Sequence, residues 1–544
     1  MPTQPRPLAG SPLRRAIALL VPLAGIISAC GADAGVVTLS ATPTPTVVTI
    51  PPVAPPVTPS TGEPVSADET LSMLADELPA AGLPPIVEPE LLVAISLADV
   101  VDVDDNKPPR EHDEFVAVAL TDIERWWGEV FPDVYGEPHE PLEGGVYAGY
   151  PERGSPIPGC GTSTTDYLDL QMFVAFYCEL GDFMAYDDGD SEDSLLTPLA
   201  DAFGPAVMGV VLAHEYGHAI QGRIGALDDF LATIVTEQQA DCFAGAWTGQ
   251  AYRGESPLLR LGDADLRSGL LAMLEVRDPV GTNQFEPGGH GSAFDRVGAF
   301  QEGFVAGPTR CAELLENPLP LMPNQFRDAV DQGRGGNAPY DCSNDPDPDC
   351  SPVTEFLAED LNDFWQTAVG DDFVALTAIA VDDPADFSCD DMVVLATRVA
   401  ICASERTVVY DGPEVFELYN DFGDFALGYL YGIGWAEFVQ QTLASPLTGE
   451  DRALLGDCFT GAWVRDITPD DLGNTPRQGD RDGDGVPDTV TSSPGDLDEA
   501  IMIAILVGDT GINDDVVGSP FEKIDNFRTG VLGGLPACEA ILAG

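Results

Sequence analysis

The residues of this sequence best suited to chemistry form the stretch HEYGH, from His214 to His218. Side chains four residues apart share one face of a helix, so both imidazoles can reach one metal ion. Glu215 stands beside the first imidazole, where it can take a proton from a water bound to that metal. Glu237 follows nineteen residues after His218 and can complete the ligand set, with a fourth position left for water. These donors predict one Zn²⁺ and metal-assisted hydrolysis.

Further side chains can assist such a centre. Asp241 lies one turn beyond Glu237 and can accept the free ring N–H of a ligand histidine, which would orient that ring. His290 can stabilise the oxyanion that forms when water attacks a peptide carbonyl, and Tyr216 and Tyr186 are weaker candidates for this role. Plainer readings stay open: ordinary helix histidines without a metal, a solvated carboxylate at Glu237, and a helix-capping loop residue at His290.

Two helices must position these residues. The first predicted helix holds HEYGH in an apolar segment, with Pro205 near its start and Gly222 near its end. The second continues from EQQAD (237–241) into ADCFAGAWTG, whose small residues let it pack close to another helix. A short β element is expected around FYCELGDFMAY (176–186).

Five motifs together resemble those of the bacterial neutral zinc metallopeptidase family. In chain order they are FYCELGDFMAYDDG, HEYGHAIQ, EQQADCFAGAW, GDADL and HGSAFDRVGAFQEGF. This family belongs with the gluzincins, so the resemblance implies a helix-rich α+β fold of the zincin type. It also implies a zinc peptidase, with the ligands His214, His218 and Glu237 and the catalytic residue Glu215.

One of these motifs carries a further implication. The spacing of His290 and Arg296 resembles a pattern in other HExxH peptidases, in which the two side chains lie beside the substrate. The resemblance therefore places His290 and Arg296 near the metal centre. Gln238 and Glu179 depart from the family pattern, which has Leu and Pro there, but neither is a ligand.

The sequence also contains an internal repeat. DCFAGAW (241–247) returns as DCFTGAW (457–463), and five other blocks match in the same order; one of them pairs 114–122 with 355–363 without gaps. This order predicts a tandem duplication of one helix-rich α+β domain. The predicted boundaries are an active domain at 113–312, a linker at 313–354 and a second copy at 355–541.

The second copy lacks the candidate ligands. The counterparts of His214, Glu215, His218, Glu237 and His290 are, in that order, Ile433, Gly434, Glu437, Ala453 and Val517. We therefore expect this copy to fold but not to hydrolyse a substrate. The same degeneracy supports a rival hypothesis, in which the protein is a cell-surface binding or scaffolding lipoprotein with a vestigial metal site.

Residues 480–491 of the second copy resemble a calcium-binding loop. The side chains of Asp480, Asp482, Asp484 and Asp488 and the carbonyl of Val486 are its candidate ligands, with Gly485 at the sharp turn. The twelfth position is Thr491 rather than a bidentate Glu, so Asp496 or Asp498 would have to supply the missing carboxylate. The loop predicts a weak, structural Ca²⁺ site, and a merely acidic, Gly-rich loop is the alternative.

Ten cysteines remain once Cys30 is set aside, an even number that predicts five disulfides in an exported protein. The repeat matches four cysteines of one copy with four of the other, so each copy should form the same two bridges. The predicted pairs are Cys160–Cys178, Cys242–Cys311, Cys342–Cys350, Cys389–Cys402 and Cys458–Cys538.

The first thirty residues are typical of an export signal. A basic start precedes the apolar segment 16–29, and Ile-Ser-Ala-Cys at its end resembles a bacterial lipobox. We expect lipidation at Cys30 and an extracytoplasmic, membrane-anchored lipoprotein; an ordinary secretory signal is the alternative. Residues 31–66 are rich in Thr and Pro, a composition that predicts an extended tether. Residues 67–112 are acidic, and we expect them to form a segment in front of the domain.

The formal net charge is −67, with Lys only at positions 107 and 523. Such a surface repels nucleic acid and anionic headgroups, so we expect no nucleic-acid partner. The expected partner is a peptide or protein substrate.

Overall fold

The fold is known from a computed structural model of the chain. The described residues are 89–161, 174–190, 194–227, 232–285, 288–326, 329–343, 350–382, 384, 387–396, 398–468, 478–479, 488–489, 491–508 and 518–543. The predicted signal peptide with Cys30, the tether at 31–66 and residues 67–88 lie outside these ranges. So do Asp480, Asp482, Asp484 and Val486 of the predicted calcium loop, whereas Asp488 begins a short strand.

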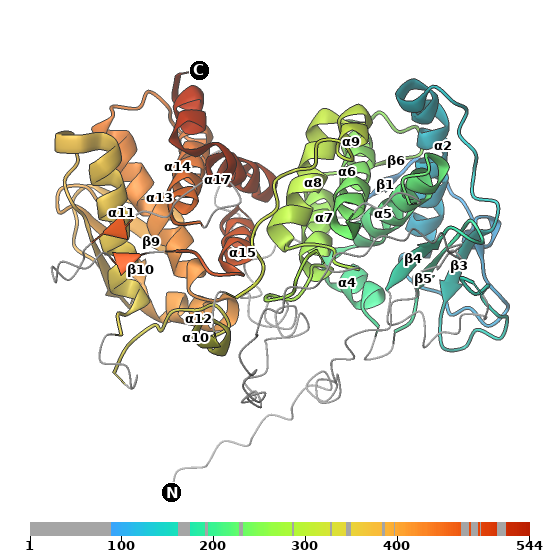
Figure 1. Ribbon diagram of the computed structural model, residues 1–544, viewed down its shortest axis with the longest axis horizontal. Helices are drawn as coiled ribbons and strands as arrows, with labels where there is room; N and C mark the ends of the chain where they lie inside the picture. The colour runs from blue at the N-terminus through green and yellow to red at the C-terminus, as the bar shows by residue number, and fades with distance from the viewer. Residues whose placement is uncertain are drawn as a thin grey trace, which may run out of the picture.

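The first half combines a four-stranded mixed sheet with a group of packed helices (Figure 1). In the sheet order β2-β3-β5-β4, β3 runs parallel to β2 and β5, and β4 pairs antiparallel with β5. The strands are β2 (Val101–Asp102), β3 (Gly145–Gly149), β4 (Ala175–Cys178) and β5 (Phe183–Asp187). The helices are α2 (Asp113–Tyr135), α4 (Leu196–Phe203), α5 (Ala206–Arg223), α6 (Thr233–Tyr252), α7 (Asp263–Glu275), α8 (Ala293–Ala306) and α9 (Pro308–Glu313).

The first domain starts before residue 113. Strand β1 (Glu90–Leu91) pairs with β6 (Leu259–Arg260), and β2 is an edge strand of the main sheet, with the 3₁₀ turn Leu97–Asp99 just before it. Residues 90–112 therefore pack as part of the domain rather than as a separate segment in front of it.

Helix α6 is almost entirely buried, and glycines let α8 approach it closely. A Cβ on Gly245 would stand 1.9 Å from the Phe300 carbonyl oxygen, and one on Gly303 would stand 1.8 Å from the Cys242 carbonyl oxygen. Any larger side chain at either position would force the two backbones apart. The predicted close packing of the small-residue helix is thus explained at these two contacts.

The second half also pairs a four-stranded sheet with packed helices, here in the sheet order β7-β10-β9-β8. Strand β10 runs parallel to β7 and antiparallel to β9, and β8 pairs antiparallel with β9. The strands are β7 (Thr377–Val381), β8 (Met392–Ala396), β9 (Val399–Cys402), β10 (Thr407–Asp411) and the short pair β11 (Gln478–Gly479) and β12 (Asp488–Thr489). The helices are α11 (Val353–Val369) with the 3₁₀ turn Gly370–Asp372, α12 (Gly412–Phe422), α13 (Phe425–Thr442), α14 (Glu450–Ile467), α15 (Asp496–Gly508) and α17 (Pro520–Ala543).

The predicted linker is partly packed against both halves. Met322 and Asn324 are buried, and the Met322 backbone N–H donates to Asp295 on α8. After the short helix α10 (Ala329–Gly333), the Ala338 N–H donates to Asp424 at the start of α13. These contacts hold the linker at defined points on each half.

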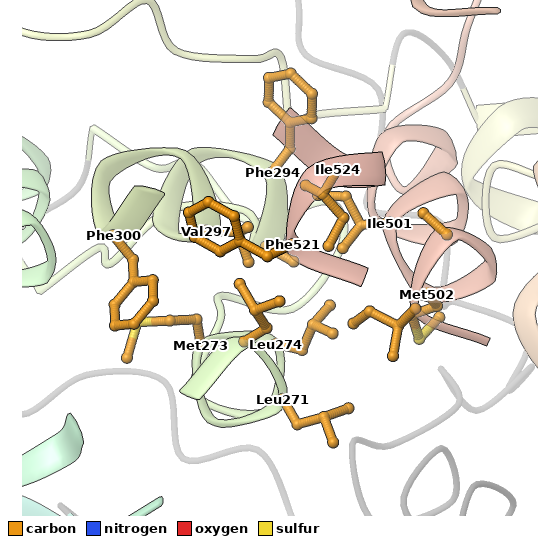
Figure 2. Packing of buried hydrophobic residues seen from close by; sticks show 14 of the residues in the cluster. Leu271, Met273, Leu274, Phe294, Val297, Phe300, Ile501, Met502, Phe521 and Ile524 are labelled. Atoms are coloured by element: carbon orange, nitrogen blue, oxygen red, sulfur yellow. The ribbon is translucent and has the colours of Figure 1, made fainter. Parts of the chain in front are cut away.

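Helices α7 and α8 of the first half pack on α15 and α17 of the second (Figure 2). Apolar side chains such as Leu274, Val297 and Ile501 fill this contact, and they belong to one continuous hydrophobic core. Polar contacts also join the two halves. Asp498 on α15 accepts a hydrogen bond from the Phe294 N–H at 3.0 Å and lies 3.5 Å from the Arg277 guanidinium.

All five predicted cysteine pairs lie at bonding distance. They are Cys160–Cys178, Cys242–Cys311, Cys342–Cys350, Cys389–Cys402 and Cys458–Cys538. Within the described ranges, no helix has both the length and the apolar character needed to cross a bilayer.

Candidate zinc centre

The centre forms where α5 crosses α6. Gly217, inside HEYGH, makes the crossing close, since a Cβ there would stand 3.0 Å from the Cα of Ala240. The crossing places Glu237, one turn before Ala240 on α6, over the histidine face of α5. Helix packing thereby brings Glu237 next to the HEYGH motif, although the two are far apart in the sequence.

Three candidate ligands meet at this crossing. The Nε2 atoms of His214 and His218 lie 3.1 Å apart, and Glu237 carboxylate oxygens lie 3.2 Å from His214 Nε2 and 3.4 Å from His218 Nε2. Glu237 and His214 are each more than nine-tenths buried, and Glu237 Oε2 accepts no hydrogen bond. The structure therefore brings together the three residues that the sequence singled out.

The donor geometry fits a zinc ion. Ligands at about 2.0–2.1 Å from a tetrahedral Zn²⁺ are separated from one another by roughly 3.3 Å, which matches the three distances between His214, His218 and Glu237. Two imidazole nitrogens and one carboxylate oxygen are also a donor set that Zn²⁺ favours.

The electrostatics of these residues agree with this fit. Burial lowers the pKa of His214, but Asp241 and Glu237 outweigh burial and raise that pKa to about 10. Burial raises the pKa of Glu237, but His218 and His214 outweigh it and hold that pKa well below its usual value. The carboxylate thus stays ionised, and the negative charge around the two imidazoles favours a cation at this position, either a proton or a metal ion.

His214 is oriented by a buried carboxylate, as predicted. Its Nδ1 lies 2.7 Å from Asp241 Oδ1, so the ring presents Nε2 to the centre. Arg296 on α8 binds both oxygens of Asp241, at 2.8 and 3.0 Å, and also donates to the Val276 carbonyl. Arg296 therefore acts through Asp241 and ties α8 to α6, the helix that carries Asp241 and Glu237.

His218 is oriented by Gln221, a residue that the motif spacing did not mark as functional. Its Nδ1 lies 2.9 Å from Gln221 Oε1, and Gln221 Nε2 donates to the Thr236 carbonyl at 2.7 Å, directly before Glu237. Gln221 is fully buried, so it ties the second ligand to the helix that carries the third. A signal was available, since Gln221 lies three residues after His218, one helical turn away.

Glu215 lies on α5 between the two ligands and is largely buried. Its negative charge is among the influences that raise the pKa of His218. Tyr216 is engaged elsewhere, because its hydroxyl lies 2.9 Å from His139 Nε2. Tyr186 is fully buried on β5, and this burial, together with the charges of Asp188 and Asp113, raises the pKa of its hydroxyl well above the usual value.

His290 lies at the surface, with about half of its side chain exposed. Its Nδ1 is 3.5 Å from Asp278, which also accepts hydrogen bonds from the backbone N–H groups of His290 and Gly291. Among the interactions of the described residues, none joins the His290 ring to His214, His218 or Glu237. The structure therefore brings Arg296, but not His290, into the ligand network.

In the second half, the residues that the predicted repeat aligns with the candidate ligands make other contacts. Glu437, the counterpart of His218, forms an ion pair with Arg452 at 2.7 Å. Asp457, the counterpart of Asp241, is paired with Lys523 at 2.9 Å and accepts a hydrogen bond from the Tyr429 hydroxyl. The sequence contains no histidine after His290, so the second half offers no imidazole ligand.

Comparisons with known proteins agree with the site. Residues 94–313 match the sequence model of a family described as "Putative neutral zinc metallopeptidase". An uncharacterized protein of Mycobacterium tuberculosis is 30% identical over 217 residues, which cover 36% of this chain and 68% of that protein. The uncharacterized protein YpfJ of Escherichia coli is 28% identical over 218 residues, covering 36% of this chain and 70% of YpfJ. No solved structure matches the chain at a significant level.

Proposed function

The chain belongs to the neutral zinc metallopeptidase family, and from this premise we propose that its first half is a zinc-dependent endopeptidase. The observation that carries the proposal is the convergence of His214, His218 and Glu237 at mutual distances of 3.1 to 3.4 Å. The comparisons confirm the predicted resemblance to this family, whereas the activity, the peptide or protein substrate and the location at the cell surface are proposals.

The proposed chemistry uses few side chains. Zinc, when bound by His214, His218 and Glu237, would polarise a peptide carbonyl and make water a stronger acid. Glu215 takes the proton of the attacking water and passes it to the leaving amine. Asp241 and Gln221 keep the two imidazoles in the orientation that binding requires. Because His290 is exposed and turned to Asp278, the proposal gives it no more than a place at the substrate-facing surface.

We further propose that the second half is a degenerate copy of the first. Equivalent contacts support this: Trp247 Nε1 donates to Asp122 in the first half, and Trp463 Nε1 donates to Asp360 in the second. Glycines mediate both close helix crossings, because a Cβ on Gly461 would stand 2.0 Å from the Phe527 carbonyl oxygen. The strand order β3-β5-β4 also corresponds to β7-β10-β9, with the same relative directions.

These contacts favour a different register for one block of the proposed repeat. The ungapped match of 114–122 with 355–363 pairs Asp122 with Asp363, but the tryptophan contacts pair Asp122 with Asp360. The same shift of three residues pairs Trp127 with Trp365, and each packs edge-on against the Phe of its DCFxGAW motif. The physical reason is that a shift of three moves a helix residue by nearly one turn and preserves the apolar face.

The lipid anchor at Cys30 and the calcium loop at 480–491 remain predictions for this chain. In this arrangement the active half is tethered outside the membrane by residues 31–66. The second half, without ligands, then stabilises the active half or contributes to substrate recognition.

The proposal is tested by zinc content and peptide cleavage of the full chain. We expect one zinc per chain in the wild type and none in Glu237→Gln. The Glu215→Gln variant should keep its zinc but cleave a peptide library about 100- to 10,000-fold more slowly, the usual contribution of a general base. As a control, Glu129→Gln on the exposed face of α2 should change neither quantity.

Two results would contradict the proposal. Zinc that survives Glu237→Gln would break the ligand assignment. A wild-type chain that holds zinc but cleaves no peptide in the library would favour the rival binding-module hypothesis.

A further inference from the structure

A second group of possible metal ligands lies in the second half, away from the zinc centre. Asp424, Asp496 and Glu499 are 7%, 5% and 8% exposed, and each offers a carboxylate oxygen within 4.8 Å of the other two. Asp424 precedes α13, and Asp496 and Glu499 lie in the first turn of α15. None of these three residues is among the candidate ligands of the first half.

In each carboxylate, one oxygen accepts a hydrogen bond from a backbone N–H. Asp424 Oδ2 accepts from the Ala338 N–H at 2.7 Å, Asp496 Oδ2 from the Ser493 N–H at 2.8 Å, and Glu499 Oε2 from the Phe425 N–H at 2.8 Å. The three donors belong to different segments, namely the linker, the loop before α15 and the start of α13. The carboxylates are therefore fixed in position before any ligand binds.

The remaining oxygen of Asp424, one of the three carboxylates of this group, makes no hydrogen bond. Asp424 Oδ1 is fully shielded from solvent and has no hydrogen-bond partner. An unpaired buried carboxylate oxygen is costly unless a cation compensates it. Glu499 Oε1 and Asn337 Oδ1 lie beside the same space, because a Cβ on Gly423, whose φ is +112°, would stand 2.1 and 2.5 Å from them.

The charge balance around this group is strongly negative. A cavity of about 280 Å³ is lined by Asp424 and Asp496, and also by Asp331 and Arg334. Among the described residues, one guanidinium thus accompanies four carboxylates when Glu499 is included. Burial raises the pKa of Asp424 to about 7 and, with the neighbouring carboxylates, raises that of Glu499 well above its usual value. The group must therefore take up either protons or a cation.

We propose that Asp424, Asp496 and Glu499 bind one Ca²⁺, with the Asn337 amide oxygen as an additional ligand. Oxygen donors only, several carboxylates and an irregular arrangement suit a hard cation, and the room in the cavity suits Ca²⁺ better than the tighter Mg²⁺. The ion fastens the linker at residues 337–338 to the starts of α13 and α15. It shares no ligand with the zinc centre, and of its ligands only Asp496 is also a candidate ligand of the predicted loop at 480–491.

The test compares calcium binding and thermal unfolding of the full, zinc-loaded chain after calcium removal on a chelating resin. We expect Ca²⁺ at about 100 times its Kd to raise the wild-type unfolding midpoint by about 3 °C, since the two halves unfold as one large unit. Glu499→Gln should bind one calcium fewer per chain and lose most of this rise. Its amide oxygen can still accept from Phe425, and removing a buried charge should leave its calcium-free midpoint at or above that of the wild type.

A matched control separates the two calcium hypotheses. Asp482→Asn with Asp484→Asn disables the predicted loop and should leave the contribution of Glu499 intact. If Glu499→Gln fails to fold, Asp424→Asn serves the same comparison. A Glu499→Gln or Asp424→Asn protein with wild-type calcium stoichiometry and an undiminished midpoint rise would overturn the proposal and leave protons shared among the carboxylates.

Discussion

At the scale of single residues, the two histidines proposed as zinc ligands are oriented by different partners. Asp241 holds His214 with a buried carboxylate that Arg296 neutralises, whereas the neutral amide of Gln221 holds His218. A carboxylate partner raises the basicity of its imidazole more than an amide does. Gln221 is therefore the partner whose loss can be tested without leaving a buried charge uncompensated.

We predict that Gln221→Met lowers zinc affinity about 10- to 100-fold, because His218 loses the acceptor that fixes its ring. Competition with a chromophoric zinc chelator measures this change. Gln440→Met is the matched control, since Gln440 Nε2 makes the same kind of bond, to the Arg452 carbonyl at 2.9 Å, beside no histidine. Equal losses of zinc affinity in the two variants would show a general loss of stability instead.

Some contacts of these residues could be predicted from the sequence, and others could not. The spacing of His214, His218 and Glu237 predicted their convergence, and one helical turn predicted the contact of Asp241 with a ligand ring. The position of His290 was not predictable, because it lies in a loop whose course is set by backbone hydrogen bonds to Asp278.

At the scale of secondary-structure elements, the centre depends on how closely helices cross. Gly217 lets α5 meet α6, and Gly245 and Gly303 let α6 meet α8. These crossings bring Glu237 to the histidines and Arg296 to Asp241. The glycines are thus part of the machinery that positions the site, although they bind nothing.

We predict that Gly245→Ala lowers the free energy of unfolding by about 1–3 kcal/mol or more, because the new Cβ meets the Phe300 carbonyl. Chemical denaturation measures this loss. Gly128→Ala on α2 is the matched control: no atom lies within 4 Å of its new Cβ, so it should stabilise the helix by up to about 1 kcal/mol. An unchanged stability of Gly245→Ala would refute the close-crossing explanation.

At the scale of the whole molecule, the two halves share one apolar core. Phe521 on α17 packs against Phe304 on α8, with ring centroids 4.6 Å apart, and its carbonyl accepts from Gln301. Arg528 is also buried there, 5.0 Å from the Phe294 ring. Because this contact continues the core, we expect the halves to unfold together.

We predict that Phe521→Ala lowers the stability by about 3–5 kcal/mol and separates the unfolding of the two halves into two calorimetric transitions. Scanning calorimetry of the full chain measures both effects. Phe285→Ala removes the same side chain from a position that is 58% exposed and should change little. A single, unshifted transition in Phe521→Ala would mean that the halves are not coupled through this contact.

The sequence by itself determined the family and the cysteine pairs and predicted the candidate ligands, because these depend on motif spacing and on the matching of similar segments. Only the tertiary structure decided which side chains surround the ligands. Gln221 joins His218 to α6, and Asp424, Asp496 and Glu499 converge from two helices, through contacts that no local pattern encodes. The physical reason is that a helix period predicts which residues share a face, whereas packing of distant segments decides what that face meets.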